Sequence, residues 1–387
     1  MRRIQILTCL LLLGFSSTGQ IIEDLSFGTD STFEVLTWNI EWFPKNDQIT
    51  IDYVTQIIEA LDVDILAIQE VDEISAFEQL IDSLGSYEGY LESSWFAGLA
   101  YIYKPDVVQI NNIYEIYTTS PYWSPFPRSP MVMDLNFMNE RIIVINNHFK
   151  CCGDGFLNLN DSGDEETRRY YASNLLKEYI DNNFTNENVI VLGDLNDILS
   201  DNLENNVFQP IINDTANYLF ADYEIAFSNN SDWSYPTWPS HIDHILITNE
   251  LFDEFEDTNS VIQTIKIDEY LTNGWWEYEN NVSDHRPVAL KLLINSNLGV
   301  TDLSTRPLVI NYPNPFSSET TFSFKIPVGK VDIQIFNIQG HLVFSEKIPS
   351  GQSKFVWNPE ELPNGIYIAR LLTNNNELGA LKLVLRR

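Results

Sequence analysis

The hydrophobic and polar positions between residues 33 and 84 predict an alternation of strands and helices. Residues 33–38 and 65–69 are apolar runs with the length of a strand. Residues 49–61 and 75–84 instead carry their apolar side chains at helical spacing. This order of elements is typical of the start of an α/β domain.

The pattern changes in the middle of the chain. Residues 131–137 and 141–146 alternate in the manner of paired strands, and the short Met-Asn-Glu turn between them favours antiparallel pairing. Helices that interrupt a mixed set of strands predict two sheets packed face to face with helices outside. A helix is then expected at 165–180, followed by strands at 189–192, 242–247, 261–267 and 287–293.

Short strands separated by Gly, Pro and Asn turns dominate the end of the chain. About seven short strands within one small domain is the pattern of an immunoglobulin-like β-sandwich. No cluster of ionisable residues accompanies them. The expected strands are 321–326, 331–336, 342–344, 354–357, 366–372 and 381–385.

Charge divides the chain in the same place as the pattern does. The 387 residues include 22 Lys and Arg against 55 Asp and Glu, a net charge of −33. Residues 21–300 hold 11 basic and 48 acidic residues, whereas residues 301–387 hold 9 and 7. We therefore expect a first domain at 20–296, a polar linker at 297–310 and a second domain at 311–387.

Composition excludes two classes of protein. With 44% apolar and 13% aromatic residues, the chain is too rich in core-forming side chains to be disordered. Its acidity excludes a nucleic-acid binder with the usual basic footprint. Any phosphate chemistry in this protein must bring in its own cations.

The first 19 residues have the features of an export signal. Arg2 and Arg3 precede an apolar run from Ile4 to Phe15, which is followed by small residues. The run is shorter than the roughly 20 apolar residues that span a bilayer, and no later segment is long enough. These features predict a soluble protein that is secreted or held at the cell surface, with no transmembrane segment.

Polar residues with catalytic or metal-binding potential follow apolar strands throughout the first domain. A carboxylate at such a place is partly desolvated and is costly unless it is paired or binds a metal. Each of these residues alone is a weak signal, but together they occur in one order, each beside an apolar strand. They are Asn39, Glu70, His148, Asp194, Asn196, Asp243, Asp284 and His285.

These motifs make the first domain resemble the endonuclease/exonuclease/phosphatase superfamily, which has the deoxyribonuclease-I-like fold. The resemblance implies a four-layered α/β/β/α sandwich that cleaves phosphate esters with a divalent cation. It covers roughly residues 33–293. The matching motifs are LTWNIEWF at 36–43, DILAIQEV at 64–71, RSPMV at 128–132, INNHF at 145–149, VIVLGDLND at 189–197, HIDHILIT at 241–248 and SDHRPV at 283–288.

The resemblance also implies a metal site. Asn39 and Glu70 match metal-binding residues of the family, and Asp284 matches a further acid near the cation. Oxygen ligands of this kind suit Mg²⁺ or Mn²⁺, which keep several waters and accept a substrate phosphate. Glu41 occupies a place where some members carry another acid near the metal, so it is either a further ligand or a solvated neighbour.

The resemblance implies roles for the remaining site residues. His285 matches the essential histidine at the scissile phosphate, and Asp243 matches the acid that orients its ring. Asp194 and Asn196 match residues that place the attacking water and hold the phosphate oxygens. His148 matches a second histidine that binds phosphate or donates a proton.

The implied reaction is in-line attack of water on phosphorus. The cation neutralises charge on the phosphate and on the leaving oxygen, while the two histidines and Asp194 handle protons. Arg128 matches a residue that approaches the phosphate backbone. No nucleophilic serine is needed for this chemistry.

Some features of the first domain have two interpretations each. The acidic segment from Cys151 to Glu166 is either a Ca²⁺ site or a solvated loop, and it lacks full EF-hand spacing. Cys151 and Cys152 form either a strained vicinal disulfide or a pair of small loop residues. His241 and His244 flank Asp243, and their faces depend on strand register, so we assign them no role.

The C-terminal part resembles the C-terminal sorting domain of the type IX (Por) secretion system of Bacteroidetes. The matching segments are NYPNPFSSETTFSF at 311–324, IFNIQGHLV at 335–343 and LPNGIYIARL at 362–371. The resemblance implies an address that the outer-membrane secretion machinery reads. An adhesive sandwich that binds carbohydrate is the alternative.

The motifs indicate the type of reaction but not the leaving group, so they do not identify the substrate. An extracellular nuclease that hydrolyses DNA or RNA without strong sequence preference is the first hypothesis. A sphingomyelinase-like enzyme or another phosphate-ester hydrolase is the second. A non-catalytic surface binding protein that keeps the fold is the third, although every motif position carries a chemically competent residue.

Overall fold

The computed structural model describes residues 20–93, 95, 97–294, 309–324, 331–349, 354–359, 362–373 and 376–387. The chain divides into two compact units, Met1–Asn295 and Ser296–Arg387. The predicted export signal and residues 297–308 of the predicted linker lie outside the described residues. Within those residues, no helix combines the length and the hydropathy needed to cross a membrane.

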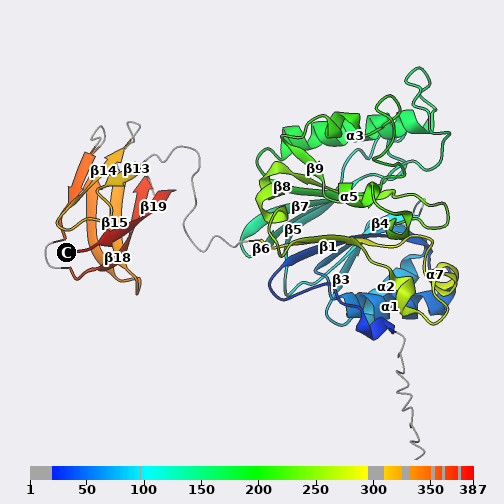
Figure 1. Ribbon diagram of the computed structural model, residues 1–387, viewed down its shortest axis with the longest axis horizontal. Coiled ribbons are helices and arrows are strands. Elements are labelled where there is room, and N and C mark those ends of the chain that lie inside the picture. The colour runs from blue at the N-terminus through cyan, green and yellow to red at the C-terminus, as the bar shows by residue number, and fades with distance from the viewer. Residues whose placement is uncertain are drawn as a thin grey trace, which may run out of the picture. The chain divides into compact units, whose positions relative to one another are not determined.

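The first unit contains two six-stranded sheets (Figure 1). The first sheet has the order β11-β12-β1-β2-β4-β3, and the second has the order β5-β6-β7-β8-β10-β9. Strands of the first sheet are β1 (Phe33–Phe43), β2 (Ile65–Val71), β3 (Glu88–Leu91), β4 (Gly98–Tyr103), β11 (Val261–Thr264) and β12 (Val288–Leu292). Strands of the second are β5 (Gln109–Glu115), β6 (Met131–Phe137), β7 (Glu140–His148), β8 (Asn188–Asp194), β9 (Tyr218–Phe220) and β10 (Asp243–Thr248).

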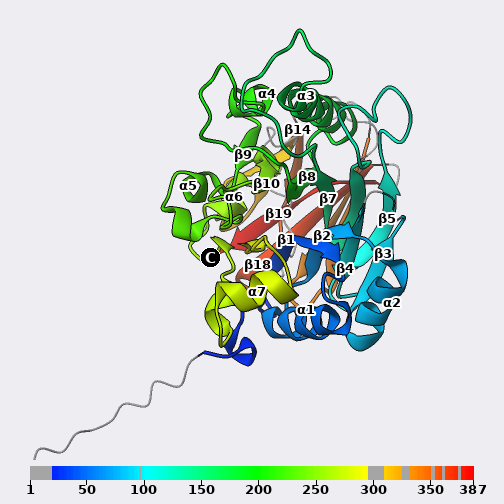
Figure 2. The ribbon, with the colours of Figure 1, turned by 90° about the vertical axis from the view of Figure 1, so that its right-hand side faces the viewer.

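Helices cover the outer faces of both sheets. In Figure 2, α1, α2 and α7 lie beneath the two sheets and α3 lies above them. Shorter helices and 3-10 turns occupy the connections. The helices are α1 (Asp47–Leu61), α2 (Ile74–Ser83), α3 (Glu165–Asn183), α4 (Gln209–Ile212), α5 (Tyr223–Ala226), α6 (Phe252–Phe255) and α7 (Trp275–Asn281), and the 3-10 turns are η1 (Ile22–Asp24), η2 (Asn230–Asp232), η3 (Asn249–Leu251) and η4 (Ile267–Tyr270).

Three apolar layers account for this four-layered α/β/β/α arrangement. Trp38 of β1 packs with the helices on one side of the first sheet, and Val35 packs in the layer between the sheets. Val191 of β8 and Leu176 of α3 belong to the third layer. Because both faces of the central strands are buried, those strands are almost continuously apolar in sequence.

The side chains that face between the sheets change from apolar to polar towards one end of the sandwich. Along β1 the inward side chains run from Phe33 and Val35 to Asn39, and along β8 they run from Ile190 to Asp194. Since strand side chains alternate between faces, each of these polar groups shares a face with its apolar predecessors. Apolar side chains therefore fill the layer between the sheets at one end of the sandwich, and polar side chains occupy it at the other end.

The second unit is an immunoglobulin-like β-sandwich. A three-stranded sheet has the order β13-β14-β17, and a four-stranded sheet has the order β16-β15-β18-β19. Phe322, Ile333 and Trp357 are among the residues of its core. The strands are β13 (Val309–Tyr312), β14 (Thr320–Phe324), β15 (Val331–Asn337), β16 (Leu342–Ile348), β17 (Lys354–Trp357), β18 (Gly365–Thr373) and β19 (Asn376–Leu385).

One predicted strand is too long. The strand expected at 261–267 ends at Thr264, and a 3-10 turn begins at Ile267. Ile265 and Ile267 are both buried in the layer beneath α7. The alternation of apolar residues therefore continues beyond the strand, because a turn can bury residues two apart as well as a strand can.

Candidate active site

The polar end of the sandwich is built from strand termini that come from both sheets. β1 and β2 are parallel, as are β7 and β8, so their C-terminal ends lie at the same end of the unit. β10 runs antiparallel to β8, and its first residue, Asp243, pairs with Asp194. β12 runs antiparallel to β1, which brings the preceding residues Asp284 and His285 to this end.

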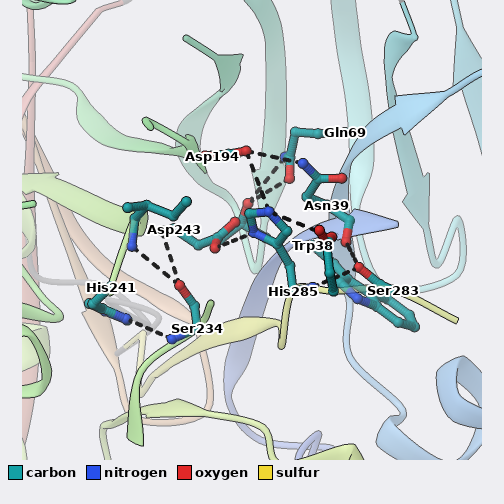
Figure 3. Close-up of polar contacts among 12 residues, drawn as sticks. Trp38, Asn39, Gln69, Asp194, Ser234, His241, Asp243, Ser283 and His285 are labelled. Carbon is teal, nitrogen blue, oxygen red and sulfur yellow. Dashed lines mark hydrogen bonds and ion pairs between the residues drawn. The ribbon is translucent and has the colours of Figure 1, made fainter. Parts of the chain in front are cut away.

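Asp243 and His285 form a buried pair at the centre of this end (Figure 3). The Nδ1 atom of His285 lies 2.8 Å from Oδ2 of Asp243. Burial opposes the charged imidazolium, but the carboxylates of Asp243 and Asp194 outweigh it and raise the pKa of His285 to about 10. The opposite ring nitrogen, Nε2, lies 3.9 Å from Oδ2 of Asp194.

Asp194 joins the two sheets. Its Oδ2 accepts a hydrogen bond from Nδ2 of Asn39 at 3.0 Å and lies 3.4 Å from Nε2 of His148. Its Oδ1 accepts from the backbone N–H of Asn196 at 3.0 Å. Burial and the neighbouring Asp243 raise the pKa of Asp194 to about 7, although His285 acts in the opposite direction.

Glu70 reaches the site through a local change in backbone direction. Regular alternation would point it away from the layer between the sheets, but its φ of 66° and a register shift in β2 turn it back. Its Oε1 accepts from Nδ2 of Asn39 at 3.1 Å, and its Oε2 accepts from the backbone N–H of Trp42 at 3.1 Å.

Asp284 joins this group through Glu41. Oε2 of Glu41 accepts from the backbone N–H of Asp284 at 2.9 Å, and the N–H of Glu41 donates to Oδ1 of Asn39 at 3.0 Å. Oδ1 of Asp284 also lies 3.8 Å from Nε2 of His285. Burial and the nearby Asp284 raise the pKa of Glu41, so these acids share one partly desolvated region.

His148 is buried on the side of Asp194 away from Asp243, and its Nδ1 has no hydrogen-bond partner among the described residues. Burial, Arg128 and His285 hold the pKa of His148 well below its ordinary value. Arg128 donates from Nε to the carbonyl of Ala97 at 3.2 Å. Its pKa is lowered by burial, against the attraction of the carboxylates of the site.

Three residues form hydrogen bonds to the backbone around the site, although no sequence pattern singles them out. Ser283 donates to the carbonyl of Asn39 at 2.6 Å and accepts from the N–H of His285. Tyr278 donates to the carbonyl of His285 at 2.6 Å. Ser234 accepts from the N–H of Asp243 at 3.2 Å, as Figure 3 shows. Single Ser and Tyr residues in loops are common, so only their contacts identify them.

A second buried group of titratable residues lies behind the first. Oδ2 of Asp222 lies 3.0 Å from Nε2 of His241 and 2.6 Å from Nδ1 of His244. Nδ1 of His241 accepts from the N–H of Ser234, which ties this group to Asp243. His244 points away from Asp243 because adjacent residues of a strand face opposite sides.

The donor chemistry of the site fits a hard divalent cation. Carboxylates of Asp194, Glu70 and Asp284 gather around amide and imidazole groups, and burial of several acids without added positive charge is unfavourable. Ligand atoms of Asp194, Asp243 and His285 lie within 4.8 Å of one another. Asn39 directs its amide nitrogen towards Glu70 and Asp194, and its oxygen accepts from Glu41.

Sequence comparison defines the class of protein. Residues 36–285 match the model of the endonuclease/exonuclease/phosphatase family, and residues 311–386 match the secretion system C-terminal sorting domain. This chain therefore belongs to the endonuclease/exonuclease/phosphatase family. A search of curated proteins returned no significant match.

Solved structures show the same fold at low sequence identity. D. rerio TDP2 in complex with a single strand DNA product is 14% identical, covers 68% of this chain and 99% of its own, and has a TM-score of 0.50. An endonuclease/exonuclease/phosphatase from Bacteroides vulgatus is 15% identical, with coverages of 67% and 98% and a TM-score of 0.47. The human Nocturnin catalytic domain with bound sulfate is 14% identical, with coverages of 68% and 94% and a TM-score of 0.47.

Together the two matches describe a secreted enzyme of the phosphodiesterase type. The sorting domain indicates secretion or attachment to the cell surface, through interaction with the type IX secretion machinery. The family consists of hydrolases that depend on divalent metals, and the acids and histidines described above could hold such an ion.

Proposed function

We propose that this protein is an extracellular nuclease that hydrolyses phosphodiester bonds of DNA or RNA without strong sequence preference. The observation that carries the proposal is the centre at Asp194. One carboxylate oxygen there lies 3.4 Å from His148 and 3.9 Å from His285, and it also accepts from Asn39. A phosphate bound near Asp194 would therefore have groups that can donate or accept a proton on more than one of its sides.

His285 and Asp243 handle the proton of the leaving group in this proposal. The Asp243 carboxylate fixes the orientation of the ring through Nδ1 and favours its protonated form. Nε2 of His285 then faces the phosphate with a proton to donate. His148 binds a phosphate oxygen or donates a second proton.

Asp194 and Asn196 place the attacking water and hold the phosphate oxygens. A carboxylate whose pKa is raised to about 7 accepts a proton from water more readily than an ordinary aspartate does. Asn196 is held next to it by the hydrogen bond between its N–H and Asp194. Arg128 approaches the phosphate backbone.

Asn39, Glu70 and Asp284 would hold the cation, which we propose to be Mg²⁺ or Mn²⁺. The bound ion supplies neutralisation of charge on the phosphate and on the leaving oxygen. The side-chain nitrogen of Asn39 faces the carboxylates of Glu70 and Asp194. The amide of Asn39 would therefore have to rotate before its oxygen could bind an ion. A separate Ca²⁺ ion is the proposal for the acidic insertion, where Asp154, Asp164 and Glu166 lie close together.

The charge of the protein argues against docking on anionic membrane lipids. An acidic surface gains nothing from anionic lipids, and its contact with a polymeric phosphate depends on added cations and on salt. The fold is shared with D. rerio TDP2, whose structure holds a single strand DNA product, which is compatible with a nucleic-acid substrate. A sphingomyelinase-like lipid phosphodiesterase is the second candidate, favoured by exposed aromatic residues such as Trp123 and Trp276.

The test is hydrolysis of plasmid DNA, RNA and sphingomyelin by the purified protein with Mg²⁺, Mn²⁺, Ca²⁺ or a chelator. We expect turnover of DNA or RNA that the chelator abolishes. Turnover of sphingomyelin alone would favour the second candidate. No turnover of any phosphate ester in any metal would favour a non-catalytic surface binding protein.

Substitution of His285 ties the activity to this site. We expect His285→Ala to reduce phosphodiester hydrolysis by about 10²-fold or more, because a general acid contributes that much. The midpoint of thermal unfolding should change little. His341→Ala, in the second unit, is the matched control and should keep full activity. Parallel loss of folding and activity in His285→Ala would mean that this residue is structural.

A further inference from the structure

A cavity of about 830 Å³ lies beside the candidate active site. Its walls come from five separate parts of the chain, and Arg128 is one of the lining residues. Lys150 and Cys151 also line the cavity, and they follow closely after His148, the last residue of β7. The cavity therefore lies next to the candidate active site, and the charge of Arg128 acts on His148.

The cavity concentrates positive charge in a strongly acidic unit. Lys150 and Arg168 line it together with Arg128, which makes three of the 11 basic residues between positions 21 and 300. Lys150 donates to the carbonyl of Cys151 at 2.9 Å, and Arg168 donates from Nε to the carbonyl of Ser124 at 2.6 Å. Among the described lining residues Glu115 is the one acid, and Nζ of Lys150 also lies 4.0 Å from Oε1 of Glu165. This balance suits an anionic ligand.

Two indole rings line the same cavity and are largely exposed. The exposed fraction is 76% for Trp95 and 62% for Trp123. Trp123 is tethered through Nε1, which donates to the carbonyl of Thr118 at 3.0 Å. An exposed indole ring beside positively charged side chains is the arrangement on which nucleobases stack in proteins that bind single-stranded nucleic acid.

We propose that this cavity, defined by Trp95, Trp123, Arg128, Lys150 and Arg168, binds unpaired nucleotides that flank the scissile phosphate. The bases stack on the two indole rings, and the flanking phosphates contact the three cations. Its volume lies in the range of pockets that hold small organic ligands, which matches one or two nucleotides. The inference rests on the proposed nuclease function and deepens it by naming single-stranded nucleic acid as the preferred substrate.

Preference for single strands follows from the stacking. Bases in a duplex already stack on their neighbours, so their faces are covered and cannot reach a side chain without the cost of unpairing. Unpaired bases offer a free face of any sequence to Trp95 and Trp123. The cavity would therefore favour single-stranded over double-stranded nucleic acid, whatever its base sequence.

The experiment measures binding in a background without turnover. His285→Ala protein is titrated with a fluorescein-labelled 12-nucleotide oligo(dT) and with a labelled 12-base-pair duplex, and fluorescence anisotropy reports the dissociation constants. We expect tighter binding of the single strand. Trp95→Ala with Trp123→Ala should weaken that binding about 10-fold or more, since stacking contributes roughly 1–3 kcal/mol per base. Duplex binding should change less.

Two variants serve as controls. Trp276→Ala removes an indole that is 65% exposed on α7 and does not line the cavity, so it should bind oligo(dT) as the parent does. Trp123→Phe keeps an aromatic face and should retain most of the affinity. Arg168→Ala should lower the salt dependence of binding by about one unit of slope, as loss of a phosphate contact does. Thermal unfolding of each variant checks that it is folded.

The outcomes separate this inference from the proposed function. If wild-type protein hydrolyses oligonucleotides but the double Trp variant binds them unchanged, the inference is wrong and the nuclease function stands. If wild-type protein hydrolyses no nucleic acid yet the double variant loses oligo(dT) binding, the binding site stands and the nuclease function fails. If the double variant loses binding to sphingomyelin vesicles while oligo(dT) binding is unchanged, a membrane is the partner and the inference is overturned.

Discussion

The partners of His244 fix its protonation state. Its Nδ1 faces the Asp222 carboxylate at 2.6 Å, and its Nε2 faces the carbonyl of Asp197 at 2.9 Å. Both partners only accept hydrogen bonds, so both ring nitrogens must carry a proton. Burial opposes this charge, but Asp222 outweighs it, and the pKa of His244 is raised. His244 and Asp222 therefore form a buried ion pair. Ser234 and His241 connect this pair to Asp243.

We expect Asp222→Asn to destabilise the first unit by about 3–5 kcal/mol, because removal of one partner leaves a buried charge without compensation. Urea unfolding followed by circular dichroism measures this free energy. Asp106→Asn, at an exposed turn, is the control and should unfold at the parent concentration of urea. An equal and small effect of both substitutions would show that the Asp222 pair is not a buried ion pair.

At the scale of single residues, the sequence predicts most side chains of the site. Asn39, Asp194 and Asp243 stand out because a buried polar residue at the end of an apolar strand is costly without a partner. Asp222 and Ser234 stand out only in three dimensions, since they lie in loops where such residues are frequent. Their importance comes from what they contact, and a sequence pattern does not contain that information.

Strand pairing places Asp194, and Gly193 makes that pairing possible. β7 and β8 are parallel and pair Asn147 with Gly193. Gly193 has a φ of 150°, and a Cβ atom there would lie 2.0 Å from the carbonyl oxygen of Asn147. A glycine is therefore required at the residue before the central carboxylate.

We expect Gly193→Ala to lower stability by at least about 1–3 kcal/mol through backbone strain and to lower activity further by moving Asp194. Thermal unfolding and hydrolysis of a phosphodiester measure the two effects. Gly85→Ala is the control, because its added Cβ would meet no atom within 4 Å. Wild-type activity and stability in Gly193→Ala would show that the two strands separate without cost.

At the scale of elements, most of the buried strands of the first unit are predictable, and three of its four edge strands are not. The strand predicted at 131–137 has those bounds in the structure, whereas β3, β4, β5 and β9 of the first unit were not predicted. β5 has no buried residue and lies at the edge of its sheet. An edge strand buries little surface, so its sequence lacks the pattern on which prediction depends.

The whole molecule carries a net charge of −33, and one buried acid makes its stability depend on pH in a defined direction. Burial, with the neighbouring Asp64, raises the pKa of Glu34 to about 8. In the unfolded chain an ordinary glutamate loses its proton near pH 4.3. Between these values the folded state holds a proton that the unfolded state has lost, so stability decreases as the pH rises.

We therefore expect the free energy of unfolding to fall between about pH 5 and pH 8 and the Glu34→Gln variant to show a smaller fall. Urea unfolding at a series of pH values measures both slopes. Repulsion among the many surface acids contributes to the fall in both proteins, so the difference between them isolates Glu34. Glu78→Gln, exposed on α2, should keep the parent slope. A Glu34→Gln slope equal to that of the parent would contradict a protonated Glu34.

The sequence alone determined the layers, the family and the order of polar residues at the strand ends, because period-two alternation and apolar runs are local properties of a chain. Tertiary structure decided where those residues meet. Glu70 faces the site only through its left-handed backbone conformation, and Asp222 reaches Asp243 only through Ser234 and His241. The cavity of Trp95 and Trp123 likewise joins loops distant in sequence. Such contacts arise from packing between elements, which no local pattern records.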